Sequence, residues 1–374
     1  MTQLKHLLKV ATRNLLLIFN IFSVKKNKIY FMCFNGEMYG FDQRALLEHI
    51  EAAFPEKYEF IWEYSGKMNK NINRVPGKIR FVKKLSLRQL FYIKTSKYII
   101  FNINPPSYIK FKTNQVLLNT WHGFGLKTSG NTQKAFNRQQ FNTATYFCSH
   151  AKLFTDEVIR GFFEYKGKII PCGAPRNDVF FSPKQKIWEE KVRKQYGISK
   201  ATKIVLYAPT FRENFVYSNM HINYTELLNT LHNKFNNDWV ILERLHPMIQ
   251  NKNRHLSPHV IDASHHEDMQ ELLCAADILV SDYSGCMWDF SQTKRPVFLF
   301  APDIEDYSQK RGLYIDLKDL PYPISITNNQ LLHQIETFDM ATYQTNLASF
   351  FELTGSYENG SACKAVCDNI FSLP

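Results

Sequence analysis

The amino-acid sequence predicts an α/β protein made of two Rossmann-like halves, each a parallel sheet covered by helices. Strand-like apolar runs alternate with helical patterns along most of the chain, which is the order of βαβ units. Several of these runs are apolar on both faces, as buried parallel strands are. A charged stretch from Pro183 to Lys200 separates two such series. We therefore expect two domains with a ligand cleft between them.

The first series extends from Lys28 to Cys172. Pro105-Pro106 and the segment from Asn73 to Gly77 interrupt it and predict loops. Helices are expected at Gln43–Ala53, Leu87–Lys94 and Ala151–Phe162. Strands are expected at Ile29–Phe34, Tyr58–Tyr64, Ile79–Lys83, Tyr98–Ile103, Val116–Thr120, Tyr146–Ser149 and Ile169–Cys172.

The second series follows a linker helix in the charged stretch. Its expected strands are Lys203–Ala208, Trp239–Arg244, His259–Asp262, Ile278–Val280 and Val297–Phe300. Its expected helices are Tyr224–Phe235, Glu267–Ala275, a short helix containing Met287 and Phe290, Asn329–Phe338 and Tyr343–Phe351, and a last helix spans Gly360–Phe371.

A polar turn lies at the centre of the second series, where a strand ends and a short helix begins. Ser281, Asp282, Ser284 and Gly285 form this turn, and Ser284 is expected to be the N-cap of the helix. The amides of a helix start bind phosphate readily, and open α/β sheets bind ligands at the carboxyl ends of their strands. Simple capping explains one such turn equally well, so the interpretation depends on the rest of the chain.

The composition suits a globular protein with anionic partners. The chain has 374 residues, 44% hydrophobic and 21% charged, which is enough for two domains with full cores. Its net charge is +12 and its pI is about 9.2, and this balance favours nucleic acid, anionic lipid or a phosphate-rich substrate. The basic residues are spread along the chain, and no nucleic-acid-binding signature occurs, so nucleic acid is not expected as a partner.

The seven cysteines are odd in number and scattered, mostly in apolar runs. This pattern indicates buried thiols in a reducing compartment rather than a disulfide framework. Cys363 and Cys367 lie one helical turn apart and are interpreted as packing residues.

Residues 1–27 predict a basic amphipathic helix. Apolar residues such as Leu4, Leu8, Leu15 and Phe19 recur at helical spacing among lysines. The uninterrupted apolar run is too short to span a bilayer, and the residues after it make a poor signal-peptidase site. We expect the helix to lie on a membrane surface, although an ordinary helix packed on the core is the alternative.

His122 is the candidate general base. It follows an expected buried strand, and Gly123 and Gly125 come next, which lets the backbone approach a ligand closely. A histidine at a strand end can move a proton near neutral pH. Lys127, in the same turn, is placed to meet a phosphate. Taken alone, His122 is better explained as a histidine that hydrogen-bonds within its own turn.

Other cations follow other strands. Thr210 and Arg212 come after one strand of the second half, and Arg244 and His246 after the next. Arg311 follows the polar turn and its helix. Each of these cations alone is most simply a solvated surface charge. Together with the Ser/Thr turns they predict a site that binds phosphate and moves one proton, as phosphoryl transfer requires.

Several familiar signatures are missing from the sequence. It has no Asp-x-Asp pair for a divalent metal, no P-loop and no G-x-G-x-x-G after a strand. The run His265-His266-Glu267-Asp268 looks metal-like, but we interpret its acids as the start of a helix. We therefore expect no metal site, no other cofactor, and neither a P-loop kinase nor a dinucleotide-dependent dehydrogenase.

Seven stretches of the sequence form a specific set of motifs. They are NTWHGFGLKTSG (119–130), GAPRND (173–178), YAPTFRE (207–213), LERLHP (242–247), ADILVSDYSGCMWDF (276–290), RPVFLFAPDIEDY (295–307) and RGLYID (311–316). In this order, they resemble the CDP-glycerol glycerophosphotransferase family of teichoic-acid and capsule biosynthesis. The segment 358–371, ENGSACKAVCDNIF, is similar to the closing helix of that family.

The resemblance implies a GT-B fold, in which two Rossmann-like domains face a cleft and the second holds most of the donor nucleotide. We expect an acceptor domain at 28–182, a donor domain at 183–355, and a helix at 356–374 that packs back on the first domain. CDP-glycerol is the implied donor, and a lipid-linked glycan or polyanionic polymer is the implied acceptor. The implied location is the cytoplasmic face of the cell membrane, where the enzyme is peripheral.

The roles of the site residues follow from the matched motifs. His122 is the implied base on the acceptor hydroxyl, and His246 the implied catalytic residue at the donor phosphates. Gly123 and Lys127 belong to the acceptor side of the site. Donor-binding roles are implied for Thr210, Arg212, Arg244, Ser281, Asp282, Ser284, Gly285 and Arg311.

The sequence departs from the family pattern at a few positions. Phe124-Gly125 stand where Thr-Pro is common, Gly285 where a second serine is common, and Asn359-Gly360 where Asp-Gly is usual. Phe124 and Gly125 alter the acceptor side of the turn.

Three alternatives remain open from the sequence. The first lies within the family: the chain could be a CDP-ribitol-dependent transferase or a mixed capsule polymerase. The sequence also does not distinguish a primase, which adds the first unit, from a polymerase. A sugar-nucleotide epimerase or glycosyltransferase on the same fold is a second alternative. A non-catalytic module that binds anionic glycan is the third, because the positive charge and the many aromatic residues permit it.

Overall fold

The computed structural model describes residues 17–66, 79–123, 138–210, 222–245, 259–304, 315 and 319–371. The chain divides into two compact units. Unit 1 contains the described residues of Met1–His122, Asn137–Asp178 and Tyr357–Pro374, and unit 2 those of Gly123–Phe136 and Val179–Ser356. No helix among these described ranges is both long enough and apolar enough to cross a bilayer.

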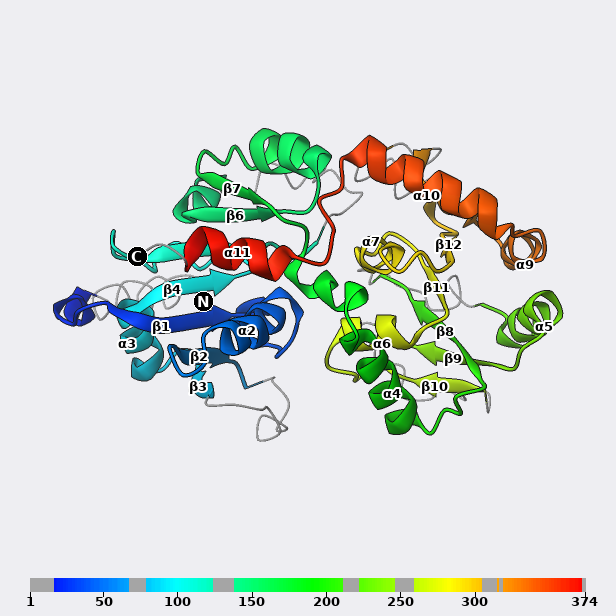
Figure 1. Cartoon of the computed structure of the whole chain (residues 1–374), viewed down its shortest axis with the longest axis horizontal. Helices are drawn as coiled ribbons and strands as arrows, with labels where there is room; N and C mark the ends of the chain where they lie inside the picture. Colours follow the sequence, from blue (N-terminus) through cyan, green and yellow to red (C-terminus); the bar gives the residue numbers. More distant parts are fainter. Residues whose placement is uncertain are drawn as a thin grey trace, which may run out of the picture. The chain divides into compact units, whose positions relative to one another are not determined.

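Unit 1 is built on a parallel sheet with strand order β3-β2-β1-β4-β5-β6-β7 (Figure 1). The strands are β1 (Lys25–Met32), β2 (Glu59–Tyr64), β3 (Ile79–Lys83), β4 (Ser96–Phe101), β5 (Val116–Asn119), β6 (Tyr146–Ser149) and β7 (Lys168–Pro171). The helices are α2 (Phe41–Ala53), α3 (Leu87–Thr95), α11 (Ala362–Ile370), the π-helix η6 (Phe154–Phe162), and the 3₁₀ turns η1 (Phe19–Ile21), η2 (Phe34–Gly36) and η5 (Arg138–Thr143); the 3₁₀ segment η7 (Pro175–Phe181) leads out of the unit.

Unit 2 repeats this plan with the strand order β10-β9-β8-β11-β12-β13, again parallel (Figure 1). The strands are β8 (Lys203–Ala208), β9 (Trp239–Glu243), β10 (Val260–Asp262), β11 (Ile278–Ser281), β12 (Val297–Phe300) and β13 (Ile324–Ser325). The helices are α4 (Lys184–Tyr196), α5 (Tyr224–Phe235), α6 (Met269–Ala275), α7 (Cys286–Ser291), α9 (Asn328–Glu336) and α10 (Met340–Thr354).

Each unit has the strand order of a doubly wound sheet, in which the chain reverses its direction of winding once. The reversal lies between β1 and β4 in unit 1 and between β8 and β11 in unit 2. At such a point the loops that leave the two central strands diverge to opposite faces of the sheet, which opens room for a ligand at their carboxyl ends. The topology therefore marks one candidate ligand position in each unit.

The core of unit 1 contains residues from both ends of the sequence. Ile29, Phe31 and Trp62 of the central strands pack in the same cluster as Val366 and Ile370 of α11. In Figure 1, α11 (red) lies over this sheet beside α2, which it contacts. The ring of Phe371 lies 4.5 Å from that of Tyr98 on β4.

The sequence motif GAPRND fixes α11 to unit 1. The side chain of Ser361, the N-cap residue of α11, does not cap the helix; its Oγ donates to Asn359 Oδ1 instead. Asp178 provides the cap: its carboxylate oxygens accept hydrogen bonds from the amides of Ala362 (2.9 Å) and Cys363 (2.8 Å). Two amides that would otherwise lack partners are thereby satisfied from a distant part of the chain.

The predicted α/β fold with parallel sheets is correct, and the expected strands occur within a few residues of their predicted bounds. The buried thiols are also confirmed, since all seven cysteines are buried and free. Asp268 starts α6 as its N-cap, as expected of the acids in that run. Among the described residues, no cluster of three metal-ligating side chains occurs.

Four details of the prediction were wrong or incomplete. The helix expected at Ala151–Phe162 is largely a π-helix, because Phe163 N donates to Val158 O, five residues back. Gly285, not Ser284, is the N-cap residue of α7, since Ser284 Oγ meets the amide of Cys286 only at 3.4 Å. Strand β13 was missed because it has two residues. Of the helix expected at 1–27, residues 1–16 lie outside the described residues, and β1 already begins at Lys25.

Replacement of Asp178 by alanine is expected to lower the free energy of unfolding by about 1–2 kcal/mol, the usual cost of losing a helix cap. Asp368→Ala is the matched control on the same helix, because Asp368 only forms an exposed pair with Lys364 and should cost about 0.5 kcal/mol or less. Urea titration of the three proteins measures both values. Equal midpoints for the two variants would contradict the capping role of Asp178.

Candidate active site

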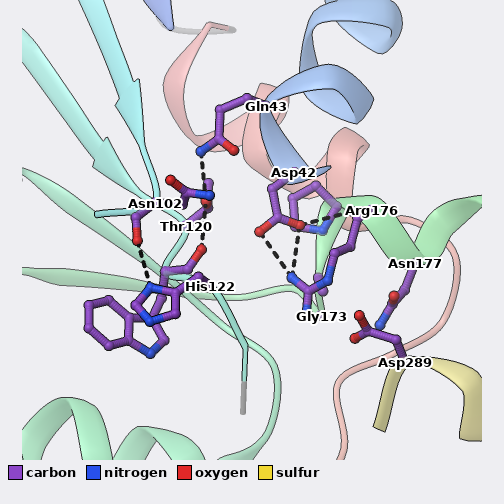
Figure 2. Close-up of polar contacts among 12 residues, drawn as sticks. Asp42, Gln43, Asn102, Thr120, His122, Gly173, Arg176, Asn177 and Asp289 are labelled. Carbon is purple, nitrogen blue, oxygen red and sulfur yellow. Dashed lines mark hydrogen bonds and ion pairs between the residues drawn. The ribbon is translucent and has the colours of Figure 1, made fainter. Parts of the chain in front are cut away.

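The candidate base, His122, lies just beyond the carboxyl end of β5, beside the reversal point of unit 1 (Figure 2). Its Nδ1 is 3.0 Å from the backbone oxygen of Asn102, which follows β4. A carbonyl oxygen only accepts hydrogen bonds, so Nδ1 carries the proton in this contact. Nε2 of the neutral ring is therefore the basic nitrogen, and His122 keeps an exposed surface.

Asparagines hold this turn from both strands. Asn102 is fully buried, and its Oδ1 accepts a hydrogen bond from Phe34 N (2.9 Å), beyond β1. Asn119, at the end of β5, accepts from Trp121 N (2.8 Å) and donates to Asn104 Oδ1 (3.0 Å). The carbonyl that fixes the tautomer of His122 is thus fastened to the neighbouring strand end.

Trp121 adopts an unusual backbone conformation with φ +57°, which is rare for a bulky residue. Its ring lies 4.0 Å from the His122 ring and 4.7 Å from that of Phe163, so aromatic packing supports the strained turn. Gly123 follows at φ +133°, a conformation that side chains rarely adopt. The strain is concentrated at the proposed base, as is common at functional sites.

A buried ion pair lies near His122 (Figure 2). Arg176 Nη1 donates to both carboxylate oxygens of Asp42 (3.1 and 3.0 Å), and Arg176 N donates to the same group. The guanidinium also lies 4.3 Å from the centre of the Phe41 ring. Desolvation by the packing around the ring lowers the pKa of His122 below its ordinary value of 6.5, and the charge of Arg176 lowers it further.

The C-terminal segment completes this part of unit 1. Glu358 Oε1 accepts hydrogen bonds from Ala174 N (3.0 Å) and Asn177 Nδ2 (2.9 Å). Gly173 has φ +85°, and a Cβ there would lie 2.7 Å from Glu358 Oε2. The glycine of GAPRND is therefore required both by its backbone conformation and by the carboxylate against it.

In unit 2, Thr210 and Asp282 meet across the reversal point between β8 and β11. Thr210 N donates to both oxygens of the buried Asp282 carboxylate (3.0 and 2.9 Å), and Thr210 Oγ1 donates to Oδ1 at 2.5 Å. Ser281 Oγ, also fully buried, donates to Ala208 O (2.7 Å). Asp282 and Ser281 hold the two strand ends together, and their predicted contact with a donor stays a prediction.

Other predicted donor residues at this edge of unit 2 are more accessible. Ser284, Gly285, Thr210 and Arg244 are only partly buried. Arg244 N donates to Tyr207 O, and its Nη2 lies 3.4 Å from His266 O, so the loop after β10 supports the arginine. Burial lowers the pKa of Arg244 from its ordinary value, which still leaves the guanidinium a cation at neutral pH.

Four predicted site residues lie outside the described residues: Lys127, Arg212, His246 and Arg311. Sequence reasoning missed others that the structure brings to the His122 site, namely Asp42, Asn102, His150 and Glu358. His150 follows β6, stacks on Phe154, and has a pKa well below its ordinary value because it is buried. A polar residue just after a predicted strand was the available signal for His150. Asn102 lay within the expected strand Tyr98–Ile103, and β4 in fact ends one residue before it. No signal marked Asp42.

The chain matches the model of a known protein family. The family model described as CDP-glycerol:poly(glycerophosphate) glycerophosphotransferase covers residues 15–372. The chain belongs to this family. A glycerophosphotransferase of this kind moves a phosphorylated polyol, which agrees with a candidate base in unit 1 and with amides and a cation at the strand ends of unit 2.

Relatives from several bacteria are similar over most of the chain. A teichoic acid poly(glycerol phosphate) polymerase of Bacillus spizizenii is 29% identical, over 91% of this chain and 91% of that protein. The chain spans about half of a relative of the same name from Staphylococcus epidermidis, which is 30% identical over 93% of this chain and 51% of that protein. A teichoic acid poly(ribitol-phosphate) polymerase of Bacillus spizizenii is 28% identical over 84% of this chain and 53% of that protein.

A solved structure has the same fold. It is a histidine-to-asparagine variant of the wall teichoic acid polymerase TagF soaked with CDPG, and it aligns with a TM-score of 0.82 at 27% identity. The alignment covers 99% of this chain and 96% of that one.

The rate of glycerophosphotransfer is expected to fall at acid pH with an apparent pKa below 6.5, because only neutral His122 accepts a proton and its pKa is lowered. Arg176→Gln removes a charge that repels the protonated imidazole, so it should move the acid limb of the pH–rate profile to higher pH. Arg176→Lys keeps the charge and should move the limb less. Initial rates from pH 5 to 9 measure the limb, and circular dichroism checks that the variants are folded. An identical limb in both variants would exclude the influence of Arg176.

Asp282→Ala should lower the free energy of unfolding by about 1.5–3 kcal/mol, the usual cost of losing hydrogen bonds to a charged group. Asp282→Asn keeps one acceptor and should cost less. Ser284→Ala is the control, because the Ser284 hydroxyl makes one long hydrogen bond within the described part of the chain, from Cys286 N at 3.4 Å. We expect unchanged stability but a raised KM for the donor. Thermal unfolding and donor titrations separate the two effects, and a stable Asp282→Ala protein would contradict the positioning role.

Proposed function

We propose that this chain transfers glycerol phosphate from CDP-glycerol to a hydroxyl group of a lipid-linked glycan or a growing teichoic-acid polymer, and releases CMP. The observation that carries the proposal is the fixed tautomer of His122. Within a glycerophosphotransferase family, a histidine is suited to deprotonate an acceptor hydroxyl when Nδ1 is bound to a carbonyl and Nε2 has no partner among the described residues.

In the proposed reaction, Nε2 of His122 accepts the proton of the acceptor hydroxyl. The acceptor oxygen forms a bond to the phosphorus that carries the glycerol. The bond from that phosphorus to the oxygen bridging the two phosphates breaks, and its electron pair leaves with CMP. The products are a phosphodiester and CMP, and the proton passes from His122 to solvent.

In the proposed site, unit 2 binds the donor. The accessible Ser284, Gly285 and Arg244 support this assignment, since amides, a hydroxyl and a guanidinium are suited to phosphate. We propose Thr210 and Arg212 beside the nucleotide, and His246 and Arg311 at the pyrophosphate. These cations, rather than a metal or another cofactor, neutralise the donor phosphates in our proposal. Gly123 and Lys127 then belong to the acceptor side.

The proposed architecture is GT-B, with an acceptor domain at 28–182, a donor domain at 183–355 and a returning helix at 356–374. Two doubly wound sheets in succession and the packing of α11 in the core of unit 1 support it.

CDP-ribitol is the alternative donor within the family. A ribitol-phosphate polymerase is similar over 84% of this chain, against 91% for the glycerol-phosphate polymerase of the same organism. The glycerol donor is favoured by this difference in coverage. Whether the enzyme starts or extends the polymer depends on the acceptor, and a capsule polymer is an alternative product.

We propose a peripheral location on the cytoplasmic face of the membrane. Leu17, Ile18 and Ile21 are exposed just before β1, and Lys25 and Lys26 follow them. An apolar segment beside cations suits an anionic membrane surface. The amphipathic helix expected at 1–27 belongs to the same proposal.

The wild-type protein should release CMP from CDP-glycerol when an acceptor-containing membrane extract is present, and His122→Ala should lower this rate about 10²–10⁴-fold, the usual contribution of a general base. His333→Ala, at an exposed position on α9, is the matched control and should retain the wild-type rate. Chromatography of the nucleotides measures CMP.

Each other outcome has a definite meaning. CMP release from CDP-ribitol alone would replace the donor in our proposal. Full activity of His122→Ala would remove the base. No release from either donor, with retained binding of an anionic glycan, would support the non-catalytic module instead.

A further inference from the structure

Unit 1 has a cavity at the edge of the sheet opposite to His122. Its volume is about 450 Å³, and it lies beside the amino ends of β5 and β6, where Gln115, Leu117 and Thr145 line it. The loop between β4 and β5 forms one wall, and residues of η5 form another. Because His122 follows the carboxyl end of β5, the cavity belongs to a different site.

The walls of the cavity are held by buried hydrogen bonds. Gln115 is buried, and its Nε2 donates to the carbonyl oxygens of Ile93 (2.6 Å) and Ser96 (2.7 Å), while its Oε1 accepts from Lys112 N (2.8 Å). Thr145 Oγ1 accepts from Leu117 N (3.1 Å). The loop that carries the lysines of the cavity is therefore fixed to the sheet.

The cavity is positively charged and lacks compensating acids. Lys110 and Lys112 line it, and none of its described lining residues is acidic. Lys112 Nζ donates to the carbonyl oxygens of Asn20 (3.2 Å) and Phe22 (2.5 Å), and the nearby Lys94 Nζ, 2% exposed as a residue, donates to Lys110 O (2.5 Å). Within the described ranges, none of these three ammonium groups pairs with a carboxylate.

Burial disfavours the charged forms of Lys94 and Lys112, and repulsion from Lys112 adds to this at Lys94, so a bound anion would stabilise both cations. The pKa of Lys94 is lowered by burial and by the charge of Lys112, and burial lowers the pKa of Lys112. The sequence explains why no acid helps: from Tyr64 to Thr155 it contains no Asp or Glu. The positive charge of this segment therefore comes from its lack of acids, which the spread of basic residues along the chain does not reveal.

The apolar segment η1 borders the cavity, because the carbonyls that Lys112 binds belong to η1 and to Phe22 after it. The rings of Phe19 and Phe22 pack on Phe91 of α3 at 6.4 and 5.2 Å, which anchors η1 to unit 1. Ile18 and Ile21 remain 60% and 80% exposed. A cationic cavity bordered by exposed apolar side chains is suited to a ligand that has both a phosphate group and a hydrocarbon tail.

We propose that this cavity binds the phosphate of an anionic phospholipid, with Lys110 and Lys112 as its cationic ligands, while Ile18 and Ile21 enter the lipid hydrocarbon. Threonine hydroxyls and the Gln140 amide of the cavity wall supply neutral donors to the phosphate oxygens. The inference deepens the peripheral location in our proposed function, and its test is separate from catalysis.

The test is binding of the full chain to sedimented vesicles of phosphatidylcholine with and without phosphatidylglycerol. Lys110→Gln should weaken binding to the anionic vesicles about fivefold, the contribution of one lysine near such a surface, and Lys110→Glu should weaken it more. Lys186→Gln and Lys186→Glu, at an exposed position on α4, make the same charge changes and should have little effect. Ile21→Ser should weaken binding to both kinds of vesicle.

The outcomes separate the possible sources of phosphate. Equal binding of the Lys110 and Lys186 variants to anionic vesicles would overturn the proposal. Inorganic phosphate could raise the melting temperature of the wild type but not that of Lys110→Gln, while both proteins bind anionic vesicles equally. In that case the cavity binds a free anion and not a lipid. CMP release to a soluble acceptor should be unchanged in Lys110→Gln. If the wild type releases no CMP but still binds anionic vesicles through Lys110, the proposed function is refuted and the lipid site is supported.

Discussion

Two polar side chains at the reversal points of the sheets determine the candidate site. At the end of a central parallel strand the backbone leaves its ladder, so its amides need other partners. Asn102 supplies one to Phe34 in unit 1, and Asp282 supplies one to Thr210 in unit 2. Each side chain joins the ends of two strands that are neighbours in the sheet and distant in the sequence. The Asn102 carbonyl then fixes the tautomer of His122, so the position of the proposed base depends on the connectivity of the sheet.

Much of this organisation was predictable from the sequence. The strands were, because buried parallel strands are short apolar runs with clear polar ends, and Thr210, Asp282 and His122 stood at those ends. The partners were not predictable, because Asp42 meets Arg176 and Asp178 meets Ala362 only after the sheet has formed. The π-helix was missed for a related reason, since its apolar pattern is the same as that of an α-helix.

Acidic residues are unevenly distributed along the chain. The long acid-free segment from Tyr64 to Thr155 includes both His122 and the lysines of the cavity at the opposite edge of the sheet. In our proposals, a polyanionic acceptor and an anionic lipid surface place the same electrostatic demand on these two edges. One run of sequence without carboxylates meets both demands, although periodicity and motif spacing give no indication of it.

The position of α11 has a consequence for the order of events during synthesis. Strands β1 to β7 leave the ribosome before any strand of unit 2, yet part of their core is covered by residues 362–371. Unit 1 therefore waits with an exposed apolar face until the whole of unit 2 has been made. The unit that begins first is completed last, and a nascent chain of this kind offers a natural binding surface for chaperones throughout translation.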